Sequence, residues 1–232
     1  MKVDVVCANP AFLSLIEKQD QIVFLDANFF IPPDRSYFSG VGPYRFDRYK
    51  EIWLEPLLSE FSGISIHESV YDELVSASTK AYVDTNANAD PQRLRVFYDS
   101  ELSINEKAIM VAYIDKLAVH SQYDPDKNNA KDRGEVLSLS YMAAKKYLYF
   151  AANDDLPIRL IKETGRLNTG LEEMGIIQMY ELIYYLHKTG KYNNKELRTL
   201  YKYQYYLTGR EKQQNPEWGV FIQKMDELYQ RY

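Results

Sequence analysis

Residues 21–31 read QIVFLDANFFI, and this stretch decides the fold. Its first part, from Gln21 to Leu25, is a short and largely apolar run that ends at Asp26. Strands of a parallel sheet are covered on both faces, so they read as continuous apolar runs rather than as alternating ones. The stretch therefore predicts a buried parallel strand whose carboxyl end leads into an acid.

Three further runs of the same kind follow along the chain. They cover Ile64–Ile66, Tyr147–Ala152 and Ile176–Met179, and Tyr147–Ala152, the third strand along the chain, ends at Asn153-Asp154-Asp155. Helical patterns lie between and after them, at Ser69–Ala77, Asn105–His120, Glu135–Lys146, Leu156–Lys162 and Tyr180–Lys188. Strands that alternate with helices predict an α/β fold with a central parallel sheet.

Two regions fall outside this alternation. Residues 78–131 contain the turn-rich linker TKAYVDTNANADPQ and then the apolar-periodic stretch INEKAIMVAYIDKLAVHSQ, which together predict a helical insertion. The tail contains two more candidate helices, at about 193–207 and 217–231. The sequence therefore predicts one domain over residues 1–192, with the insertion inside it, and a helical C-terminal extension over residues 193–232.

The composition excludes several classes of protein. With 46% hydrophobic and 26% charged residues, the 232-residue chain is typical of a globular domain. One cysteine, Cys7, and three separated histidines exclude an internal disulfide and a zinc site of the Cys/His type. No run of about 18 apolar residues predicts a membrane span, and the start does not read as a secretory signal, so we expect a cytoplasmic protein. The net charge of −5 excludes binding to nucleic acid by net charge alone, but it leaves room for a local basic patch.

Acids follow two of the predicted strands directly. Asp26 follows the first, and Asp154 and Asp155 follow the third. Ligands of open α/β sheets bind just beyond the carboxyl ends of the strands, so these carboxylates are candidates for a site. An aspartate in this position also caps a helix or starts a turn, and that alternative stays open for each acid alone.

Two glutamates at the starts of predicted helices extend the set. Glu73 lies near the start of the helix after the second strand, and Glu135 near the start of the next long helix. The alternative is structural, because Asp132 and Glu135 have the spacing of a capping box and the helix dipole favours acids in a first turn. Asp132 and Glu68 are weaker candidates, expected as a helix cap and a solvated side chain.

Four carboxylates at one edge of a sheet predict a bound cation. Two such charges repel by about 4 kcal/mol at about 4 Å with an effective dielectric near 20, unless a cation compensates them. Carboxylate oxygens prefer Mg²⁺ or Mn²⁺ to softer metals. One or two such ions orient a phosphodiester and lower the pKa of an attacking water. If the four acids converge, the sequence predicts phosphodiester hydrolysis.

The order of these segments resembles that of the PIN domain family. The matching pieces are IVFLDANFFI, ISIHESVYDEL, DRGEVLSLSYMAAKKYLYFAANDD, LPIRLI and GIIQMYELIYYLHKTGKY. They cover about residues 21–75 and 132–192, which is roughly half of the chain. The insertion at 78–131 and the tail beyond 193 depart from the small toxin-like members of that family.

The resemblance implies a three-layer α/β/α fold and a Mg²⁺- or Mn²⁺-dependent endoribonuclease, often the toxin of a toxin–antitoxin pair. It further implies an RNA substrate, an antitoxin-like protein partner and, by analogy, a homodimer. The acids that match the metal-binding acids of the family are Asp26, Glu73, Glu135 and Asp154. Asn28 matches a polar residue that orients the first aspartate, and Asp155 binds the metal through water or takes the place of Asp154.

Two other functions stay open at this point. One is a catalytically weak PIN-like module that binds RNA or a protein partner, and the other is a structure-specific DNA nuclease. The departures at 78–131 and beyond 193 also fit a larger member that processes one specific RNA or acts within a complex. A phosphatase of the haloacid dehalogenase type is disfavoured, because it needs a second aspartate where Asn28 stands.

Basic residues suggest two places for RNA contacts. Arg159, in the helix after the acidic pair, is a candidate for a phosphate contact, with an ordinary ion pair as the alternative. Residues 188–212 hold seven basic and two acidic residues with five interleaved tyrosines, a pattern that can track a backbone and stack bases. The alternative there is a solvated helix whose tyrosines pack inward. The candidates in this stretch are Lys191, Lys195, Arg198 and Lys202.

Overall fold

A five-stranded parallel sheet forms the centre of the molecule. The computed structural model describes residues 2–39, 42 and 44–229. The sheet order is β3-β2-β1-β4-β5, and every neighbouring pair is parallel. The predicted α/β class with a central parallel sheet is therefore confirmed. The strands are β1 (Val23–Leu25), β2 (Ile64–His67), β3 (Arg95–Phe97), β4 (Tyr149–Ala151) and β5 (Gly175–Ile177).

Helices connect the strands and complete the chain. Before β3 they are α1 (Pro10–Glu17), the short η1 (Ala27–Phe29), α2 (Ser36–Ser39), α3 (Phe46–Tyr49), the π-helical turn η2 (Lys50–Leu54), α4 (Glu55–Glu60), α5 (Glu68–Glu73) and α6 (Ala77–Ala87). After β3 they are η3 (Asp99–Glu101), α7 (Ile104–Ala118), α8 (Arg133–Lys145), α9 (Asp155–Lys162), α10 (Thr164–Leu167), α11 (Met179–Lys188), α12 (Asn194–Tyr205), α13 (Gly209–Gln214) and α14 (Trp218–Tyr229).

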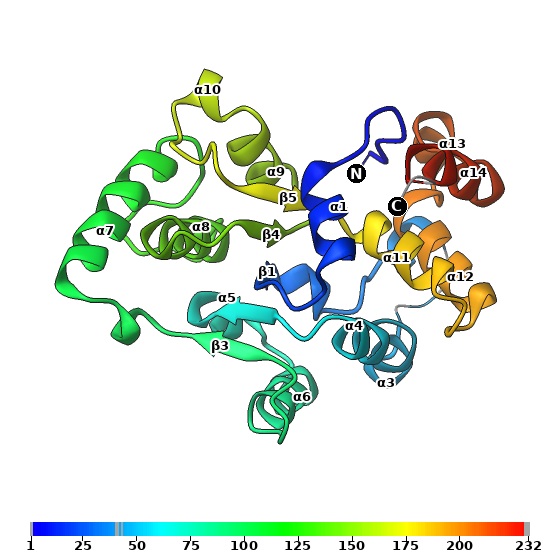
Figure 1. The fold of residues 1–232 in the computed structure, drawn as a ribbon, viewed down its shortest axis with the longest axis horizontal. Coiled ribbons are helices and arrows are strands. Elements are labelled where there is room, and N and C mark those ends of the chain that lie inside the picture. The colour runs from blue at the N-terminus through cyan, green and yellow to red at the C-terminus, as the bar shows by residue number, and fades with distance from the viewer. Residues whose placement is uncertain (1, 40–41, 43, 230–232) are drawn as a thin grey trace.

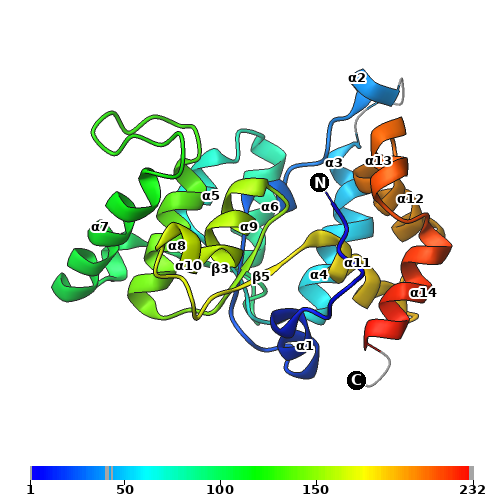
Figure 2. The same ribbon diagram turned by 90° about the horizontal axis from the view of Figure 1, so that it is seen from above.

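Strand β1 is buried on both faces, as its apolar run predicts. Val23 and Leu25 belong to the hydrophobic cluster that also holds side chains of α1, α4, α11, α12 and α14. Phe24, between them, belongs to the cluster formed with α7, α8 and α9. This is the two-residue alternation of a strand. Figures 1 and 2 show these two groups of helices on opposite sides of the sheet.

The connections reverse direction beside β1. From β1 the chain builds outward through β2 to β3, and it then returns to place β4 and β5 on the other side of β1. The carboxyl ends of β1 and β4 therefore flank the switch point of the sheet. In open α/β sheets the ligand crevice lies at this point.

Residues 78–131 are more than a helical insertion. The expected linker at 79–92 is largely helix, because Tyr82 and Val83 are buried against the domain. After it, β3 adds a fifth strand that the sequence did not reveal. Arg95–Phe97 begins with an exposed arginine and is not an apolar run, so its pairing with the neighbouring β2 is what makes it a strand. The expected helix at 105–120 is present as α7.

The other helices differ from expectation mainly at their ends. The helix expected at Ser69–Ala77 ends at Glu73. The structure adds α1, the helical run from α3 to α4, and α13, none of which the pattern predicted. The helix expected at 217–231 is α14, and residues 230–231 lie outside the described part of the chain.

The C-terminal helices share the main core. Leu197, Leu200, Tyr201 and Phe221 belong to the same cluster as Val23 of the central strand. In the described part of the chain, no helix is long and apolar enough to cross a membrane.

Candidate metal centre

Asp26 and Asp154 lie side by side at the switch point. Asp26 directly follows β1, and its backbone N–H donates to the carbonyl oxygen of Ala151, the last residue of β4, at 3.0 Å. Asp154 follows three residues after Ala151. Although each aspartate precedes a helix, neither side chain caps that helix. The capping alternative is therefore wrong for both, and both carboxylates face the site.

Asn28 joins the two carboxylates. Its side-chain Nδ2 donates to Oδ2 of Asp26 at 3.1 Å and to Oδ2 of Asp154 at 2.7 Å. One amide group thus holds two acids that otherwise repel each other. The hydrogen bond to Asp26 agrees with the expectation that Asn28 orients this aspartate. The hydrogen bond to Asp154 was not expected.

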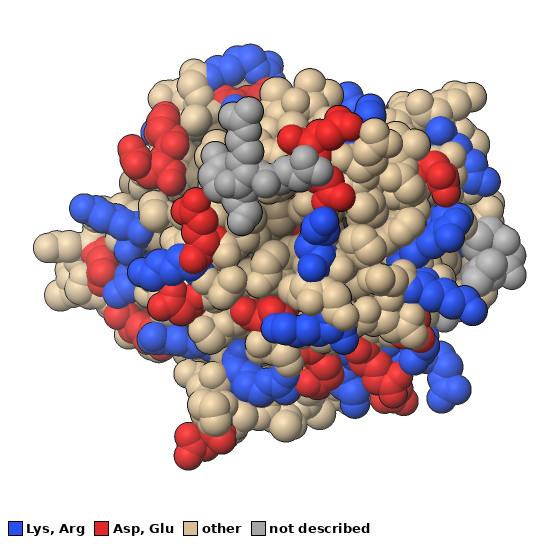
Figure 3. Space-filling view, turned by 45° about the vertical axis from the view of Figure 1, so that its right-hand side comes forward, with Lys and Arg blue, Asp and Glu red and all other residues tan. Residues whose placement is uncertain are grey.

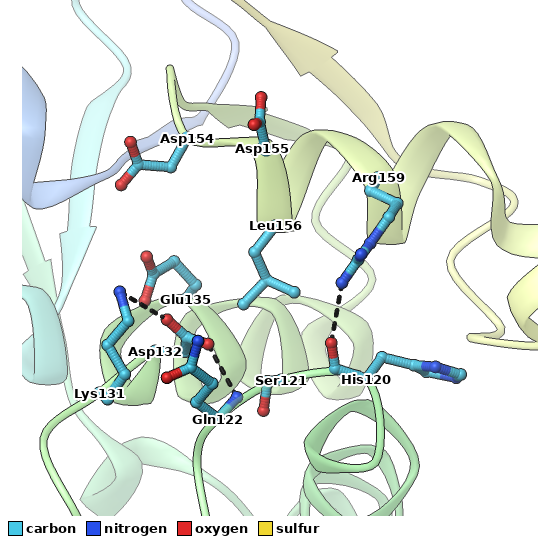
Figure 4. A pocket seen from close by; sticks show the side chains of 10 residues that line it. All are labelled: His120, Ser121, Gln122, Lys131, Asp132, Glu135, Asp154, Asp155, Leu156 and Arg159. Carbon is cyan, nitrogen blue, oxygen red and sulfur yellow. Dashed lines mark hydrogen bonds and ion pairs between the residues drawn. The ribbon is translucent and has the colours of Figure 1, made fainter. Parts of the chain in front are cut away.

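Glu135 completes a group of three. It lies in the first turn of α8, and one of its carboxylate oxygens lies within 4.8 Å of oxygens of both Asp26 and Asp154. This is a spacing at which the three carboxylates could hold a metal ion. Asp155 is not part of the group, and its side chain points away from Glu135 (Figure 4).

Glu73 lies beside this group and faces the start of α8. Its Oε1 accepts a hydrogen bond from the backbone N–H of Gly134 at 2.9 Å. The two residues touch so closely that a Cβ on Gly134 would lie 2.7 Å from Cδ of Glu73. Glycine at 134 is thus what lets Glu73 reach the site. The charge of Glu73 still acts on both Asp26 and Glu135.

Asp132 and Glu68, the weaker candidates, both differ from expectation. Asp132 has a left-handed backbone (φ 58°) and does not cap α8. Its Oδ2 instead accepts from the backbone N–H of Gln122 at 2.8 Å, which fixes the loop before the helix. Glu68 is half-buried rather than solvated, because its Oε1 accepts from the backbone N–H of Asp99 at 2.9 Å.

The four acids differ in burial, and burial is the largest cause of the raised pKa values in the site. Asp26 is 1% exposed, Glu73 and Glu135 are half-buried, and Asp154 is exposed. Burial, and then the charges of Glu135, Asp154 and Glu73, raise the pKa of Asp26 well above its usual value. Burial also raises the pKa of Glu73, and it raises that of Glu135 to about 7. The group therefore resists carrying its full negative charge without a compensating cation.

Ion pairs within the described part of the chain do not balance this negative charge. Among the described residues, none of Asp26, Glu135 and Asp154 forms an ion pair with a lysine, an arginine or a histidine. Lys131 pairs instead with Asp132 at 3.2 Å, and its charge acts on Glu135 and Asp154 without an ion pair to either. Oxygen ligands, convergent spacing and unbalanced charge all fit a hard divalent ion such as Mg²⁺ or Mn²⁺.

A pocket of about 420 Å³ opens beside the carboxylates. It lies between the loop before α8 and the helix α9, and Glu135 and Asp154 form part of its wall (Figure 4). Arg159 lines it and donates from Nη2 to the carbonyl oxygen of His120 at 2.9 Å. Arg159 is thus held by a backbone contact, not by an ion pair. Lys131 lines the pocket as well; the sequence reading missed it because YDPDKNNAKD carries only a turn signal.

The basic tail does not reach this site. Lys191 follows the far end of α11, a helix of about 15 Å that begins directly after β5. Lys191 pairs with Glu60, which lies shortly before the amino end of β2, whereas the acids lie at the carboxyl ends of the strands. Arg198 pairs with Glu217. On the face formed by these helices, basic and acidic side chains are mixed (Figure 3). Lys195 and Lys202 belong to the same helix, α12, as Arg198.

The tyrosines of this tail pack inward. Tyr201 and Tyr205 are fully buried and Tyr203 is 6% exposed, so these rings are not available to stack on bases. Stacking by these three rings is therefore wrong, and the inward-packing alternative is correct for them.

A second group of potential metal ligands lies at the end of β2. His67, Glu68 and Asp99 have ligand atoms within 4.8 Å of one another. The ring of His67 is fully buried, with Nε2 at 3.0 Å from Asp99 and Nδ1 at 2.8 Å from Ser69. Because both ring nitrogens already have partners, this group holds η3 to the start of α5.

Comparison of the chain with protein-family models, with curated proteins and with solved structures finds no match.

Proposed function

We propose that this chain is a metal-dependent endonuclease of the PIN-like type that hydrolyses phosphodiester bonds, with RNA as its substrate. One observation carries the proposal. Three carboxylates converge within 4.8 Å at the switch point of a parallel sheet, and none of them forms an ion pair with a described side chain. The order of the acids along the chain and their strand context, which resemble the PIN domain, support the same reading.

In this proposal Asp26, Glu135 and Asp154 hold the metal through their oxygens. Mg²⁺ or Mn²⁺ at this point would supply a lowered pKa for an attacking water and charge neutralisation at the phosphate. Asn28 keeps Asp26 and Asp154 in place through its two hydrogen bonds. Glu73 positions the start of α8, and with it Glu135, through Gly134.

The residues around the acids fit a phosphodiester. Asp154 is exposed, so a substrate reaches the site from solvent. Lys131 and Arg159 line the adjoining pocket and carry the positive charge that a phosphate needs. Outside the pocket, the antitoxin-like partner and the homodimer stay predictions. Co-purification with a small neighbouring gene product and the mass of the native particle would test them.

The test is cleavage of labelled single-stranded RNA, hairpin RNA and DNA with Mn²⁺, with Mg²⁺ and with chelator. Asp26→Asn and Glu135→Gln should abolish both cleavage and metal binding while keeping the circular dichroism of the fold. Glu181→Gln is the matched control, because Glu181 is also a buried acid (1% exposed) but lies outside the carboxylate group.

Each outcome decides between the candidate functions. Cleavage of RNA that is lost with chelator and with both site variants supports the proposal. Cleavage of DNA alone would replace it with the structure-specific DNA nuclease. A folded chain that binds neither metal would overturn the enzyme and leave the binding module.

A further inference from the structure

Two hollows lie on either side of the exposed acids. The first is the 420 Å³ pocket beside Glu135 and Asp154 (Figure 4). The second is larger, about 760 Å³, and lies between the N-terminal segment 2–7, the other side of α9 and residues 213–224. Asp155, at the start of α9, borders both. The two hollows therefore adjoin each other beside the carboxylates.

Unpaired lysines border the second hollow. Lys2, Lys162 and Lys224 are all exposed, and none of their side-chain ammonium groups forms an ion pair or a hydrogen bond with another described residue. The acids of this hollow are Asp4 and Asp155. In a chain with a net charge of −5, three free ammonium groups at one hollow are a local positive surface.

Cations thus lie on both sides of the acids. Lys131 and Arg159 are on one side and the three lysines are on the other, with apolar groups such as Leu156 and Val220 among them. A single strand of nucleic acid presents this alternation, with phosphates at regular intervals and apolar faces of sugars and bases between them. Volumes of 420 and 760 Å³ are also in the usual range for pockets that bind small molecules.

The walls of the two hollows come largely from outside the PIN-like segments. Residues 120–122 and 131, which face the carboxylates in the first hollow, belong to the insertion. In the second, the segment 2–7 precedes the first strand and residues 213–224 belong to the tail. These parts gather at the same edge of the sheet although they are far apart in sequence. The hydrogen bond from Val3 N to Asn215 Oδ1, at 2.9 Å, joins two of them.

We infer that the two hollows form one track for a single strand of RNA, which crosses the carboxylates at Asp155. This inference rests on the proposed nuclease and assigns a role to the added segments. Lys131 and Arg159 contact phosphates on one side of the scissile bond, and Lys2, Lys162 and Lys224 contact phosphates on the other. The strand is held on both sides, so cleavage is internal.

The test is direct binding, measured separately from cleavage. Fluorescence anisotropy of a labelled 12-nucleotide RNA is recorded with Ca²⁺ over a series of salt concentrations. The variant Lys162→Gln/Lys224→Gln is compared with Lys18→Gln/Lys107→Gln, which removes the same charge from exposed lysines outside both hollows. Loss of two phosphate contacts should weaken binding about 25-fold at about 0.1 M salt and reduce the salt slope by about 1.4. The control should bind like the unmodified chain.

Several results would overturn the track. Equal affinity of the two double variants would do so, and so would binding of an RNA duplex as tight as that of the single strand. If the unmodified chain bound no RNA, the track would fail as well. A chain that binds RNA through these lysines but cuts nothing in Mn²⁺ would keep the track and overturn the nuclease. If the chain cut RNA but the lysine variant bound RNA as tightly as the unmodified chain, the nuclease would stand and the track would be overturned.

Discussion

Asp26 combines two properties that conflict in the absence of a cation. It is 1% exposed, and it faces the charges of Glu135, Asp154 and Glu73. Both properties disfavour its ionised form. The site therefore costs stability in the metal-free chain, and a bound cation would offset that cost.

Asp26→Asn should stabilise the metal-free chain. Because the pKa of Asp26 is raised in the folded state, the fold loses stability as the pH rises from the usual pKa of an aspartate to this raised pKa, whereas asparagine stays neutral. In chelator at pH 8 we expect a gain of about 1 kcal/mol or more, or about 2–4 °C in Tm. The gain should shrink as the pH falls toward the usual pKa of an aspartate. Calorimetry with and without Mn²⁺ measures it, and Mn²⁺ should raise the Tm of the unmodified chain only.

Gly134→Ala should weaken metal binding while leaving the fold intact. The new Cβ would overlap the carboxylate of Glu73, which is the movable end of a side chain and must swing away. We expect a loss of metal affinity of about 10- to 100-fold, as for other residues that orient metal ligands. Titration calorimetry measures this loss. Gly165→Ala is the control, because a Cβ there meets nothing within 4 Å. Unchanged affinity in Gly134→Ala would show that Glu73 has no part in the site.

Glu181 should make stability depend on pH. Burial raises its pKa to about 7, although its carboxylate accepts hydrogen bonds from Gln178 N and Asn9 Nδ2. A carboxyl with a raised pKa in the folded state stabilises the fold at low pH, and this stability is lost as the pH rises from about 4.5 to about 7. The loss is about 3 kcal/mol. Urea titrations at several pH values in this range should show a smaller loss in the free energy of unfolding for Glu181→Gln than for the unmodified chain. An equal dependence on pH in the two chains would show that Glu181 does not cause the loss.

At the scale of elements, the N-terminal segment depends on one side chain of the tail. Asn215 is buried, accepts from Val3 N at 2.9 Å and donates from Nδ2 to Tyr205 O at 2.7 Å. It therefore connects the segment before α1 with α12. The second hollow owes two of its walls to this contact.

Asn215→Ala should destabilise the chain by about 1–3 kcal/mol, because buried backbone groups lose their partners. Urea unfolding followed by circular dichroism measures this change. Gln214→Ala removes an exposed neighbour and should change the free energy of unfolding by less than about 0.5 kcal/mol. Weaker RNA binding in Asn215→Ala is expected too, since Lys2 lies on the released segment. If both variants had the same stability, the contact would not hold the segment.

At the scale of the whole molecule, the tail is part of the domain. Tyr201, Tyr205 and Phe221 are fully buried in the cluster that covers one face of the sheet. Their removal would expose the apolar face of α11 and of the strands behind it. A boundary at 192, as the sequence suggests, would divide this core.

A chain truncated after Gly190 should fail to fold. Each large side chain removed from the core costs about 1.5–3 kcal/mol of burial, and the sum of several such losses exceeds the usual stability of a domain. We expect no cooperative thermal transition by circular dichroism and strong binding of a hydrophobic dye. The full-length chain is the control. A cooperative transition in the truncated chain would instead make residues 193–232 an independent extension.

The sequence by itself determined the strands β1, β2, β4 and β5, and the acids that follow β1 and β4. Each strand is a local apolar run, and a residue that directly follows a strand is placed by covalent geometry alone. The pattern thus located Asp26 and Asp154 at one edge, and the helix starts supplied Glu73 and Glu135. The convergence of Asp26, Glu135 and Asp154 agrees with that reading.

Only the tertiary structure decided which groups meet. Strand β3 exists because β2 pairs with it. Tyr201 is buried because α12 packs into the hydrophobic cluster that covers one face of the sheet. Glu73 reaches Gly134, and Lys2 comes near Lys162 and Lys224, through contacts between residues far apart in the chain. Local periodicity records which face of a segment is buried, but it carries no information about its neighbour. Which segments become neighbours depends on long-range packing. This packing is what brings acids that are far apart in the sequence together in one site.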